Sequence, residues 1–317
     1  MKERLIMLAV TMLMGVLIPW LTFGAYWEWM PEAPPVEETT APAEPETQIP
    51  VYAEGVRLMG LEAYVTGVLL GEMPASFGFE AKKAQAVVAR TYALRTIGRG
   101  NKHGVPSVCT DSACCQGYRS PEEYLHAGGS PEAVAEAERA VRETAGLVLT
   151  YNGDLAEATY FSCSGGMTED AVAVWGTEIP YLQAVESPGE EHATHYTDTL
   201  VFSPEQFASA LGVRLKGSPT AWFQGVRYTQ GGGVEAMEIG GVTYTGTELR
   251  RLLGLRSTAF TVKADENQIR ITTKGFGHRV GMSQYGADAM AAGGSNFRDI
   301  LTHYYPGTAI DKAENLG

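Results

Sequence analysis

One glutamate stands where the folded chain could shield a carboxyl group from water. Glu72 lies between an apolar run that ends in Leu70 and the helix-stopping Pro74. Burial disfavours the charged form of a carboxyl group and raises its pKa towards neutrality, as general-acid catalysis requires. An exposed glutamate at a helix end is the alternative, and composition alone favours it because most glutamates are solvated. Glu72 is therefore a candidate general acid.

A second block of interest runs from Tyr160 to Gly166 and reads YFSCSGG. Small residues after a strand make a backbone bend that a polymer can approach closely, although an ordinary tight turn has the same composition. Neither Ser162 nor Ser164 has the G-x-S-x-G surroundings of an activated nucleophile. The block therefore favours a binding surface or a plain turn over covalent catalysis.

A third block, Gly275–Tyr285, reads GFGHRVGMSQY, and HYYPG follows it from His303. Polar side chains near flexible glycines suit hydrogen bonding and stacking to a sugar. The candidates are His278, Ser283, Gln284, Tyr285 and His303. The alternative assigns Ser283 to helix capping and His278 to an ordinary loop.

Four soft or borderline metal ligands fall within thirteen residues: His103, Cys109, Cys114 and Cys115. Tetrahedral zinc takes such sets, and four protein ligands would make the site closed and structural. The spacing is not the common C-x2-C type, and disulfides are the alternative in an exported protein. Cys109 could pair with Cys114 or Cys115, and Cys163 with another cysteine. The adjacent Cys114 and Cys115 are poorly placed to bond to each other.

These blocks need elements to position them. Apolar spacing predicts helices at Leu61–Leu70 and Phe79–Ile97, and Ser130 is expected to cap a helix that runs to about Ala145. The stretch 98–129 between the last two helices is expected to be mostly loop. Further helices are predicted near 283–292 and 297–304.

Strands are predicted between and after the helices. Residues 147–151 and 155–161 read as a hairpin across Asn152-Gly153, which is typical of a type I′ turn. The sequence pattern changes at residues 198–265 and indicates an inserted α+β subregion. Near its end, Val262-Lys263 is expected to pair with Ile269–Thr273. The expected fold class is mixed α+β, with helices and antiparallel strands around an elongated substrate cleft.

The N-terminus reads as a membrane anchor. Residues 5–25 contain no ionisable side chain, and about 20 apolar residues span a bilayer core. Lys2 and Arg4 lie in the tail 1–4, so the positive-inside rule keeps that tail cytoplasmic and the rest extracytoplasmic. A cleaved signal peptide is the alternative. Residues 26–50 form an acidic, proline-rich linker, and 51–317 are expected to be an extracytoplasmic catalytic domain on a single-pass cell-membrane protein.

Composition narrows the class of protein. The chain has 317 residues, 44% of them hydrophobic, which indicates a globular protein. Its formal net charge is −13, and binding to nucleic-acid phosphates needs clustered Lys and Arg. The sequence therefore predicts no nucleic-acid partner.

Taken together, the three blocks resemble the stage II sporulation protein D family, which includes amidase-enhancer-like proteins. The first block resembles that family's Y-x-x-G-V-x-x-x-E-M-P…A-x-K-A-Q-A-x-x-A-R-T-Y pattern. The second resembles Y-F-S-x-S-G-G…W, and the third G-x-G-H-x-V-G-M-S-Q-Y-G-A-x-x-M-A…I-L-x-H-Y-Y-P-G-T. The similarity runs from about residue 54 to 308 and its motifs are long.

The resemblance implies a lytic transglycosylase that cleaves peptidoglycan glycan strands stripped of stem peptides, with a role in forespore engulfment. It implies stage II sporulation proteins P and M as partners and places the catalytic glutamate on Glu72. A lytic enzyme uses the substrate's own C6 hydroxyl as nucleophile and leaves a 1,6-anhydromuramoyl end, so one carboxyl group suffices. The candidate substrate contacts in the blocks are Tyr64, Arg90, Ser164, His278, Ser283, Gln284 and Tyr285.

The resemblance also bears on the cysteine loop and on alternative functions. Some family members bind zinc there through His, Cys, His and Cys, and in this chain Cys114 stands in place of the second His. A non-catalytic glycan-binding activator of a cell-wall amidase is the alternative function. A zinc hydrolase has little support, because the sequence contains no H-E-x-x-H motif.

Overall fold

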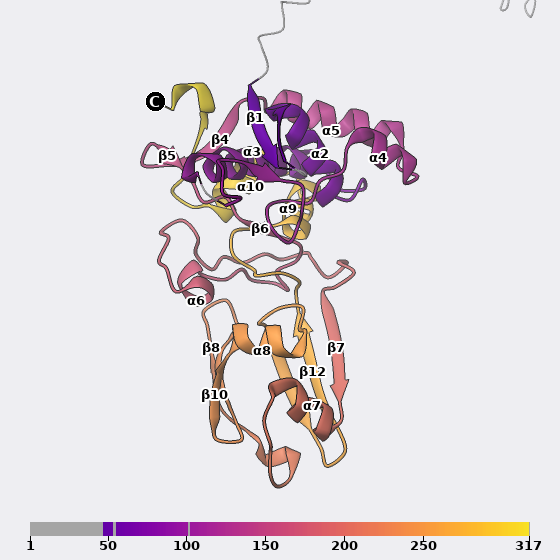
Figure 1. Cartoon of the computed structure of the whole chain (residues 1–317), viewed down its shortest axis with the longest axis vertical. Helices are drawn as coiled ribbons and strands as arrows, with labels where there is room; N and C mark the ends of the chain where they lie inside the picture. Colours follow the sequence, from indigo (N-terminus) through magenta and orange to yellow (C-terminus); the bar gives the residue numbers. More distant parts are fainter. Residues whose placement is uncertain (1–46, 53–54, 101, 317) are drawn as a thin grey trace, which may run out of the picture. The chain divides into compact units, whose positions relative to one another are not determined.

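The computed structural model describes residues 47–52, 55–100 and 102–316 (Figure 1). The predicted cytoplasmic tail, the predicted span at 5–25 and most of the predicted linker lie outside these residues. No helix within the described residues has the length and apolarity needed to cross a bilayer. The mixed α+β class of helices and antiparallel strands is confirmed.

The first described elements form a small sheet in the order β2-β1-β3. Its strands are β1 (Gln48–Tyr52), β2 (Val56–Gly60) and β3 (Val108–Cys109). β1 begins inside the segment predicted to be linker, because Ile49 and Val51 are buried in alternation with the less buried Gln48, Pro50 and Tyr52.

Three helices build the core around the first block. They are α2 (Leu61–Glu72), α3 (Phe79–Arg99) and α5 (Pro131–Glu143), as the apolar spacing predicts. Many buried positions of α3 are alanines, which let neighbouring elements approach its backbone closely. α2 ends at Glu72 because Met73 is extended and Pro74 follows.

One short helix lies within the stretch predicted to be mostly loop. α4 (Pro121–His126) begins at a capping box in which Ser120 and Glu123 satisfy each other's backbone N–H groups. None of its residues is buried, so it has no apolar periodicity to read. The stretch 98–129 is otherwise mostly loop, as predicted.

The predicted hairpin is confirmed in its first strand and turn. β4 (Leu147–Tyr151) pairs with β5 (Asp154–Leu155), and Asn152 and Gly153 have φ values of 53° and 86°. Both positive angles fit a type I′ turn. β14 (Ala309–Lys312) pairs with the other side of β4.

The second predicted hairpin strand, 155–161, is too long. Its last two residues form β6 (Tyr160–Phe161), which pairs in parallel with β13 (Met282–Ser283) instead. This pairing joins the second sequence block to the third, and long-range pairing of two-residue strands leaves no local signal in the sequence.

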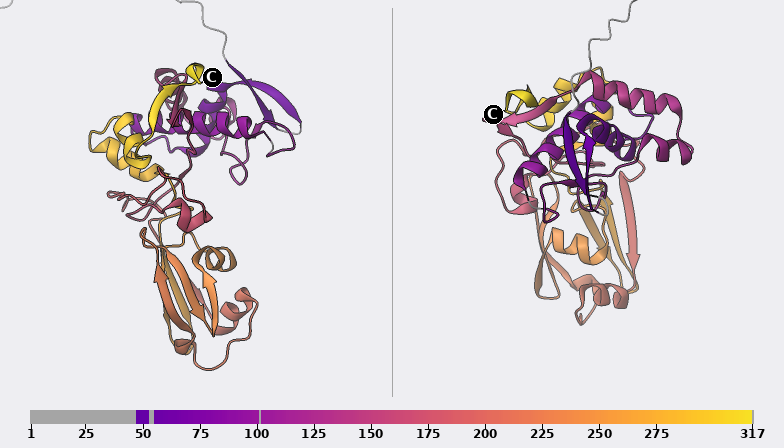
Figure 2. Two further views of the ribbon diagram at one scale, coloured as in Figure 1. Left: turned by 90° about the vertical axis from the view of Figure 1, so that its left-hand side faces the viewer. Right: turned by 45° about the horizontal axis from the view of Figure 1, so that its top comes forward.

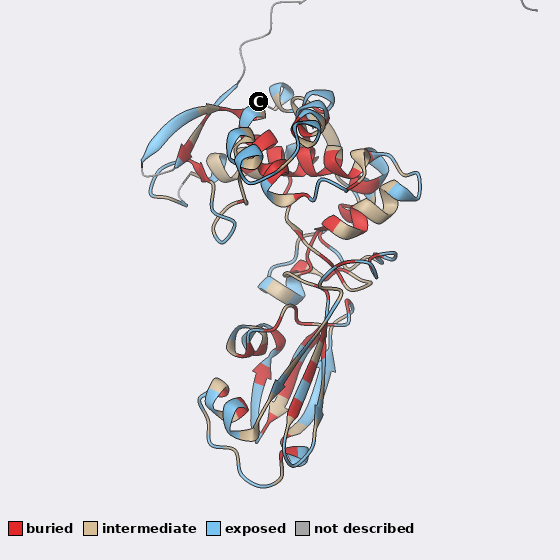
Figure 3. Ribbon diagram, turned by 90° about the vertical axis from the view of Figure 1, so that its right-hand side faces the viewer, coloured by how far each residue is buried: buried red, intermediate tan, exposed pale blue. Residues whose placement is uncertain are grey.

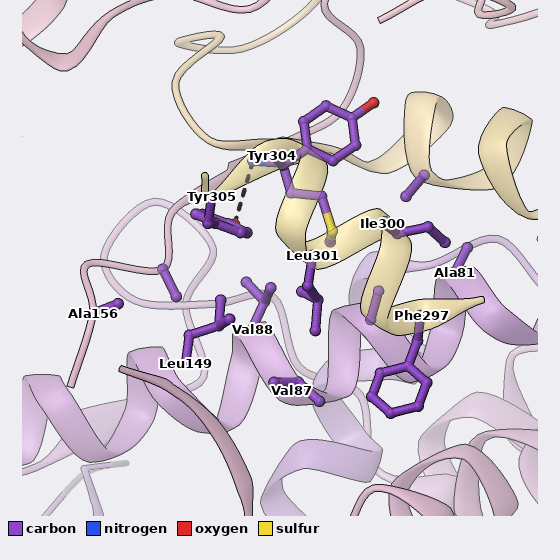
Figure 4. Close-up of a cluster of buried hydrophobic side chains, with 14 of the residues drawn as sticks. Ala81, Val87, Val88, Leu149, Ala156, Phe297, Ile300, Leu301, Tyr304 and Tyr305 are labelled. Carbon is purple, nitrogen blue, oxygen red and sulfur yellow. Dashed lines mark hydrogen bonds between the residues drawn. The ribbon is translucent and has the colours of Figure 1, made fainter. Parts of the chain in front are cut away.

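The C-terminal helices complete the helical region, which we define as residues 47–196 and 275–316. These helices are α9 (Gln284–Ala292) and α10 (Phe297–Tyr304), both near their predicted bounds; η2 (Ala313–Asn315) follows them, and α6 (Ala171–Trp175) precedes them. Figure 4 shows Leu301 of α10 beside Val87 and Val88 of α3, and Ile300 of α10 near Ala81 of α3. This apolar contact fixes the third block against the first.

Residues 197–274, which we call the β region, have a core of their own. Its strands form two three-stranded sheets in the orders β10-β9-β8 and β11-β12-β7, visible from further directions in Figure 2. The strands are β7 (Thr197–Phe202), β8 (Phe223–Tyr228), β9 (Val234–Ile239), β10 (Val242–Thr245), β11 (Phe260–Ala264) and β12 (Ile269–Lys274). The predicted pairing of 262–263 with 269–273 is confirmed.

The β region also contains α7 (Pro204–Leu211), η1 (Pro219–Ala221) and α8 (Gly246–Leu253). Phe207 of α7 and Leu249 of α8 pack with β-strand residues in one apolar cluster, and Figure 3 shows buried positions in both regions. The cluster includes Ile269 and Ile271, so the sheet takes in residues beyond the predicted subregion end at 265. Thr197 and Lys274, the first and last residues of the β region, pair with each other.

Candidate active site

Glu72 lines a hollow of about 830 Å³ where the three sequence blocks meet. One wall comes from the end of α2, and a second from the loop 110–119. The third wall contains residues of both Thr159–Ser162 and Phe276–His278, which the β6–β13 pairing holds together. The sequence placed these segments in separate blocks, and the fold brings them to one cavity.

The Glu72 carboxyl group has neutral partners and no cationic one. The backbone N–H of Gly117 donates to its Oε1 at 2.5 Å, and no salt bridge to Glu72 exists among the described residues. Burial raises the pKa of Glu72 above its ordinary value, and the Gly117 N–H, the Gln284 amide and the Tyr160 hydroxyl oppose that rise. The protonated form is thus favoured more than in water, as the sequence predicts for a general acid.

Gln284 is the polar side chain beside this carboxyl group with capacity to spare. It is 6% exposed and lines the hollow, yet its Nε2 atom completes no hydrogen bond of normal geometry within the described residues. Its amide therefore acts on the Glu72 carboxyl group without completing a hydrogen bond to it, and a ligand oxygen at this point would give the buried donor a full partner.

Two glycines allow the loop to reach Glu72. A Cβ atom on Gly117 would lie 2.8 Å from Glu72 Oε1, and one on Gly71 would lie 2.8 Å from the backbone of Gly117. A side chain at Gly71 would collide with backbone, and one at Gly117 would push the Glu72 carboxyl group out of its place. Sequence reasoning missed both residues, because a glycine required by a contact 45 residues away looks like any loop glycine.

A hydrogen-bonded chain lies behind the hollow. Tyr160 donates to Gln116 Oε1 at 3.2 Å, Gln116 Nε2 lies 3.5 Å from the Tyr64 hydroxyl, and that hydroxyl donates to the Cys109 carbonyl at 2.9 Å. Burial raises the pKa of Tyr160 well above its ordinary range, so it stays a neutral donor. Tyr64 is fully buried and does not line the hollow; its contact with sugar stays a prediction.

Arg90 is a structural partner of α2. Its guanidinium is fully buried, donates to Glu62 at 2.9 Å through Nε and 2.5 Å through Nη2, and donates to the Leu147 carbonyl at 3.0 Å. Arg90 does not line the hollow. The geometry therefore gives it a role in joining α2, α3 and β4, while direct sugar contact stays a prediction.

Ser164 belongs to a turn organised by a buried carboxylate that the sequence analysis missed. Glu190 is fully buried, and its Oε2 accepts hydrogen bonds from the Ser164 hydroxyl at 2.8 Å and from the N–H groups of Ser164 and Gly165 at 2.7 and 3.0 Å. Its Oε1 accepts from Ser187 at 2.6 Å. Ser164 is not on the cavity wall, so its sugar contact also stays a prediction.

His278 lies on the cavity wall as a neutral imidazole. Its Nδ1 accepts from the Val280 N–H at 3.1 Å, and its ring lies 5.6 Å from that of Phe161 and 5.5 Å from that of Trp175. Burial, and after it the charge of Arg250, lowers the pKa of His278 to about 4. At neutral pH this side chain therefore offers hydrogen bonding and stacking rather than charge.

Ser283 and Tyr285 face other parts of the protein. The Ser283 hydroxyl accepts the Gly286 N–H at 3.2 Å and caps α9, which is the capping alternative considered for it. Tyr285 packs edge-on against Phe77 at 4.8 Å. Neither lines the hollow.

The four candidate metal ligands converge. Their ligand atoms lie within 4.8 Å of one another, and His103 Nε2 is 3.4 Å from Cys115 Sγ. All four cysteines of the chain are free thiols, so the disulfide alternatives are not formed. One imidazole and three thiols gathered at this distance fit tetrahedral zinc. Tyr52 stacks on His103 at 5.4 Å and orients its ring.

Comparison with known proteins shows which protein family the chain resembles. The model of a family described as "Stage II sporulation protein" matches residues 52–151. "Stage II sporulation protein D" of Bacillus subtilis (strain 168) is 41% identical over 273 residues, covering 84% of this chain and 79% of that protein. Its namesake in Bacillus amyloliquefaciens is 40% identical over 280 residues, covering 86% and 81%.

A third relative has a different name. "Amidase enhancer" of Bacillus subtilis (strain 168) is 31% identical, covering 77% of this chain and 40% of that protein. The chain belongs to the stage II sporulation protein D family, which confirms the resemblance found in the three sequence blocks.

Proposed function

We propose that this protein is a lytic transglycosylase of peptidoglycan that cleaves denuded glycan strands to 1,6-anhydromuramoyl ends during sporulation. The observation that carries the proposal is Glu72, a partly buried carboxyl group with a raised pKa, no cationic partner and a position on the wall of a large hollow. Membership of a sporulation family supports the cell-wall setting.

The chemistry needs one group to serve first as acid and then as base. Protonated Glu72 gives its proton to the glycosidic oxygen as positive charge develops at C1 of the muramic sugar. The resulting carboxylate then takes the proton of the same sugar's C6 hydroxyl, whose oxygen bonds to C1. The Gly117 N–H holds Oε1 as an acceptor, which leaves Oε2 to carry the proton.

Neutral hydrogen-bond donors can accommodate Glu72 both as a protonated acid and as a carboxylate. When the carboxylate forms, the Gly117 N–H and the Gln284 amide stabilise it without being so strong as to keep it ionised at the start. Aromatic side chains of Tyr118, Phe161 and Phe276 line the same hollow and suit stacking against sugar rings.

A second candidate is hydrolysis, because another carboxylate lines the hollow. Asp111 is exposed, and its Oδ1 accepts the Ala113 N–H at 2.8 Å. With Glu72 as acid and Asp111 as a base for water, the products would have reducing ends. Asp111→Asn separates the two: a lytic enzyme keeps its activity, whereas a hydrolase that uses Asp111 loses it.

Product analysis tests the proposal directly. Purified glycan strands, with and without stem peptides, are incubated with the protein and the new ends are identified by mass spectrometry. Anhydro ends on denuded strands support the proposal. Reducing ends indicate hydrolysis, and binding without new ends identifies the non-catalytic activator of an amidase.

The same proposal includes a structural zinc ion held by His103, Cys109, Cys114 and Cys115. The ion would tie together the two ends of the loop that follows Cys109, and this loop carries Gly117 to Glu72. We further propose a single-pass membrane protein anchored by residues 5–25, with its catalytic domain outside the cell membrane and stage II sporulation proteins P and M as partners.

A further inference from the structure

Aromatic rings lead from the wall of the hollow to its margin. Phe161 and His278 both line the hollow, and the centres of their rings lie 5.6 Å apart. The ring of Trp175 in turn lies 5.5 Å from that of His278, at an interplanar angle of 52°. Trp175 is not among the residues that line the hollow. Its indole therefore lies one ring beyond the cavity wall.

Trp175 lies on a face of α6 that the fold leaves open. It is 42% exposed, and Val172, three residues earlier on the same helix, is 53% exposed. Residues three apart share a helix face. The residue that α6 buries is Ala171. Packing of the core therefore does not account for a large aromatic side chain at Trp175, whereas a ligand that covers it would.

The position of Trp175 beside His278 is fixed by contacts of the neighbouring chain. Glu169, just before α6, and Arg279, which follows His278, form a buried ion pair with Nη1 3.1 Å from Oε1. The Glu169 N–H also donates to the Arg279 carbonyl at 2.6 Å. The segments that carry the indole and the imidazole are thus tied together. A binding surface that is already in place loses little conformational entropy when a ligand arrives.

The hollow is too small for a whole glycan strand. Its volume of about 830 Å³ lies in the range that a small-molecule ligand fills. A polymer that places one of its bonds at Glu72 must therefore pass out of the hollow across the margin. At the margin beside His278, the strand would meet the open side of Trp175.

We propose that Trp175 forms a further sugar-binding subsite, in which the indole stacks against a sugar ring of the strand outside the hollow. The inference rests on the proposed function, which supplies a strand of linked sugar rings as substrate. One face of such a ring presents C–H groups that pack on an aromatic surface, while the hydroxyl groups around its edge stay hydrated. This stacking involves no charge, so the subsite favours long strands over short ones, whatever charged groups they carry.

Binding of oligosaccharides in a Glu72→Gln background tests the inference, because this variant is expected not to cleave them. The probes are denuded glycan fragments of increasing length, and calorimetry gives their affinities for the full-length protein. Trp175→Ala is expected to bind the shortest fragments like the parent and the longest about fivefold more weakly. Trp175→Tyr, which keeps a smaller ring, should lie between. The matched control Val172→Ala is expected to bind every fragment like the parent.

The dependence on fragment length distinguishes a subsite from a structural role. Equal affinities of Trp175→Ala and its parent for all fragments overturn the inference. An equal loss at every length overturns it too, because that result would mean that Trp175 supports the shape of the hollow. A loss of the same size in Val172→Ala would indicate a disturbed α6 and also counts against the subsite.

Tryptophan emission gives a second readout. The chain has five tryptophans, so comparison of Trp175→Phe with the parent isolates the contribution of one of them. A sugar stacked on the indole removes it from water and should move the emission to shorter wavelength when the longest fragment binds. This shift is expected to vanish in Trp175→Phe, and a shift of the same size in that variant contradicts the inference.

Failure of this inference and failure of the proposed function have different signatures. If the unmodified protein forms no new glycan ends, the proposed function fails, and length-dependent binding through Trp175 would then support the subsite in a non-catalytic glycan binder. If anhydro ends form but Trp175→Ala binds every fragment like the parent, only the subsite fails.

Discussion

The two ends of helix α2 carry the same chemical group in opposite surroundings. At its start, Glu62 faces the buried guanidinium of Arg90 at 2.5 Å and also accepts the Gly146 N–H at 3.1 Å. At its end, Glu72 receives only neutral donors and lies on the wall of a hollow. One carboxylate holds elements together, and the other has a raised pKa and lies where a ligand could reach it. The difference shows that the neighbours of a glutamate, and not its place on a helix, decide its work.

The largest expected effect is on cleavage. Glu72→Gln is expected to lower the rate of glycan cleavage by about 10³-fold or more, because the amide has no proton of suitable acidity to give. Glu62→Gln should retain the activity of each folded molecule. End-group analysis of digested glycan measures both variants, and substantial turnover by Glu72→Gln would remove the distinction between the two glutamates.

For the free energy of unfolding, the substitution at Glu62 is expected to have the larger effect. Glu62→Gln leaves Arg90 buried without its anion and should lower the free energy of unfolding by about 3 kcal/mol. Glu72→Gln should not destabilise the protein, since burial already disfavours the charged carboxylate. Urea unfolding compares the variants, and Glu62→Gln/Arg90→Met should recover much of the loss. Equal destabilisation at the two ends would contradict the comparison.

Removal of the proposed zinc should affect the Glu72 end of α2 more than the Glu62 end. The loop after Cys109 carries Gly117 to Glu72, whereas the partners of Glu62 are Arg90 and Gly146. A chelator, or Cys115→Ser, is therefore expected to reduce cleavage and lower the melting temperature by several degrees. Cys163→Ser is the matched control, because Cys163 lies outside the cluster. Full activity in protein shown to be metal-free would exclude this role.

The smallest expected effect concerns pH. Since Glu72 must begin protonated, kcat/KM should fall about tenfold per pH unit above the pKa of Glu72. The Gln284 amide favours the charged form, so Gln284→Leu should raise that pKa and move the falling limb to higher pH. A pH–rate profile of the two proteins checks the sign. A shift to lower pH would mean that Gln284 does not face the carboxylate during catalysis.

The features that could be predicted from the sequence are those that a local pattern of residues determines. Helix α2 ends at Glu72 because Pro74 follows, and the Asn152-Gly153 turn has its own chemical signature. The long motifs around Glu72, His278 and Gln284 were also readable, and these residues share one cavity.

Other features depend on contacts between distant residues. Glu190 organises the turn at Ser164 from 26 residues away, and Gly117 reaches Glu72 across 45. Neither stands within a periodic pattern, so nothing local distinguishes it from a surface glutamate or a loop glycine.

The pairing of Thr197 with Lys274 has a consequence for how this architecture can change. The chain leaves the helical region and returns to it through neighbouring positions, and the residues between them fold around a separate apolar cluster. A segment attached at a single point can be lengthened, shortened or exchanged without pulling on the cavity that holds Glu72. Diversification among relatives would then concentrate in the β region, leaving the Glu72 end of α2 untouched.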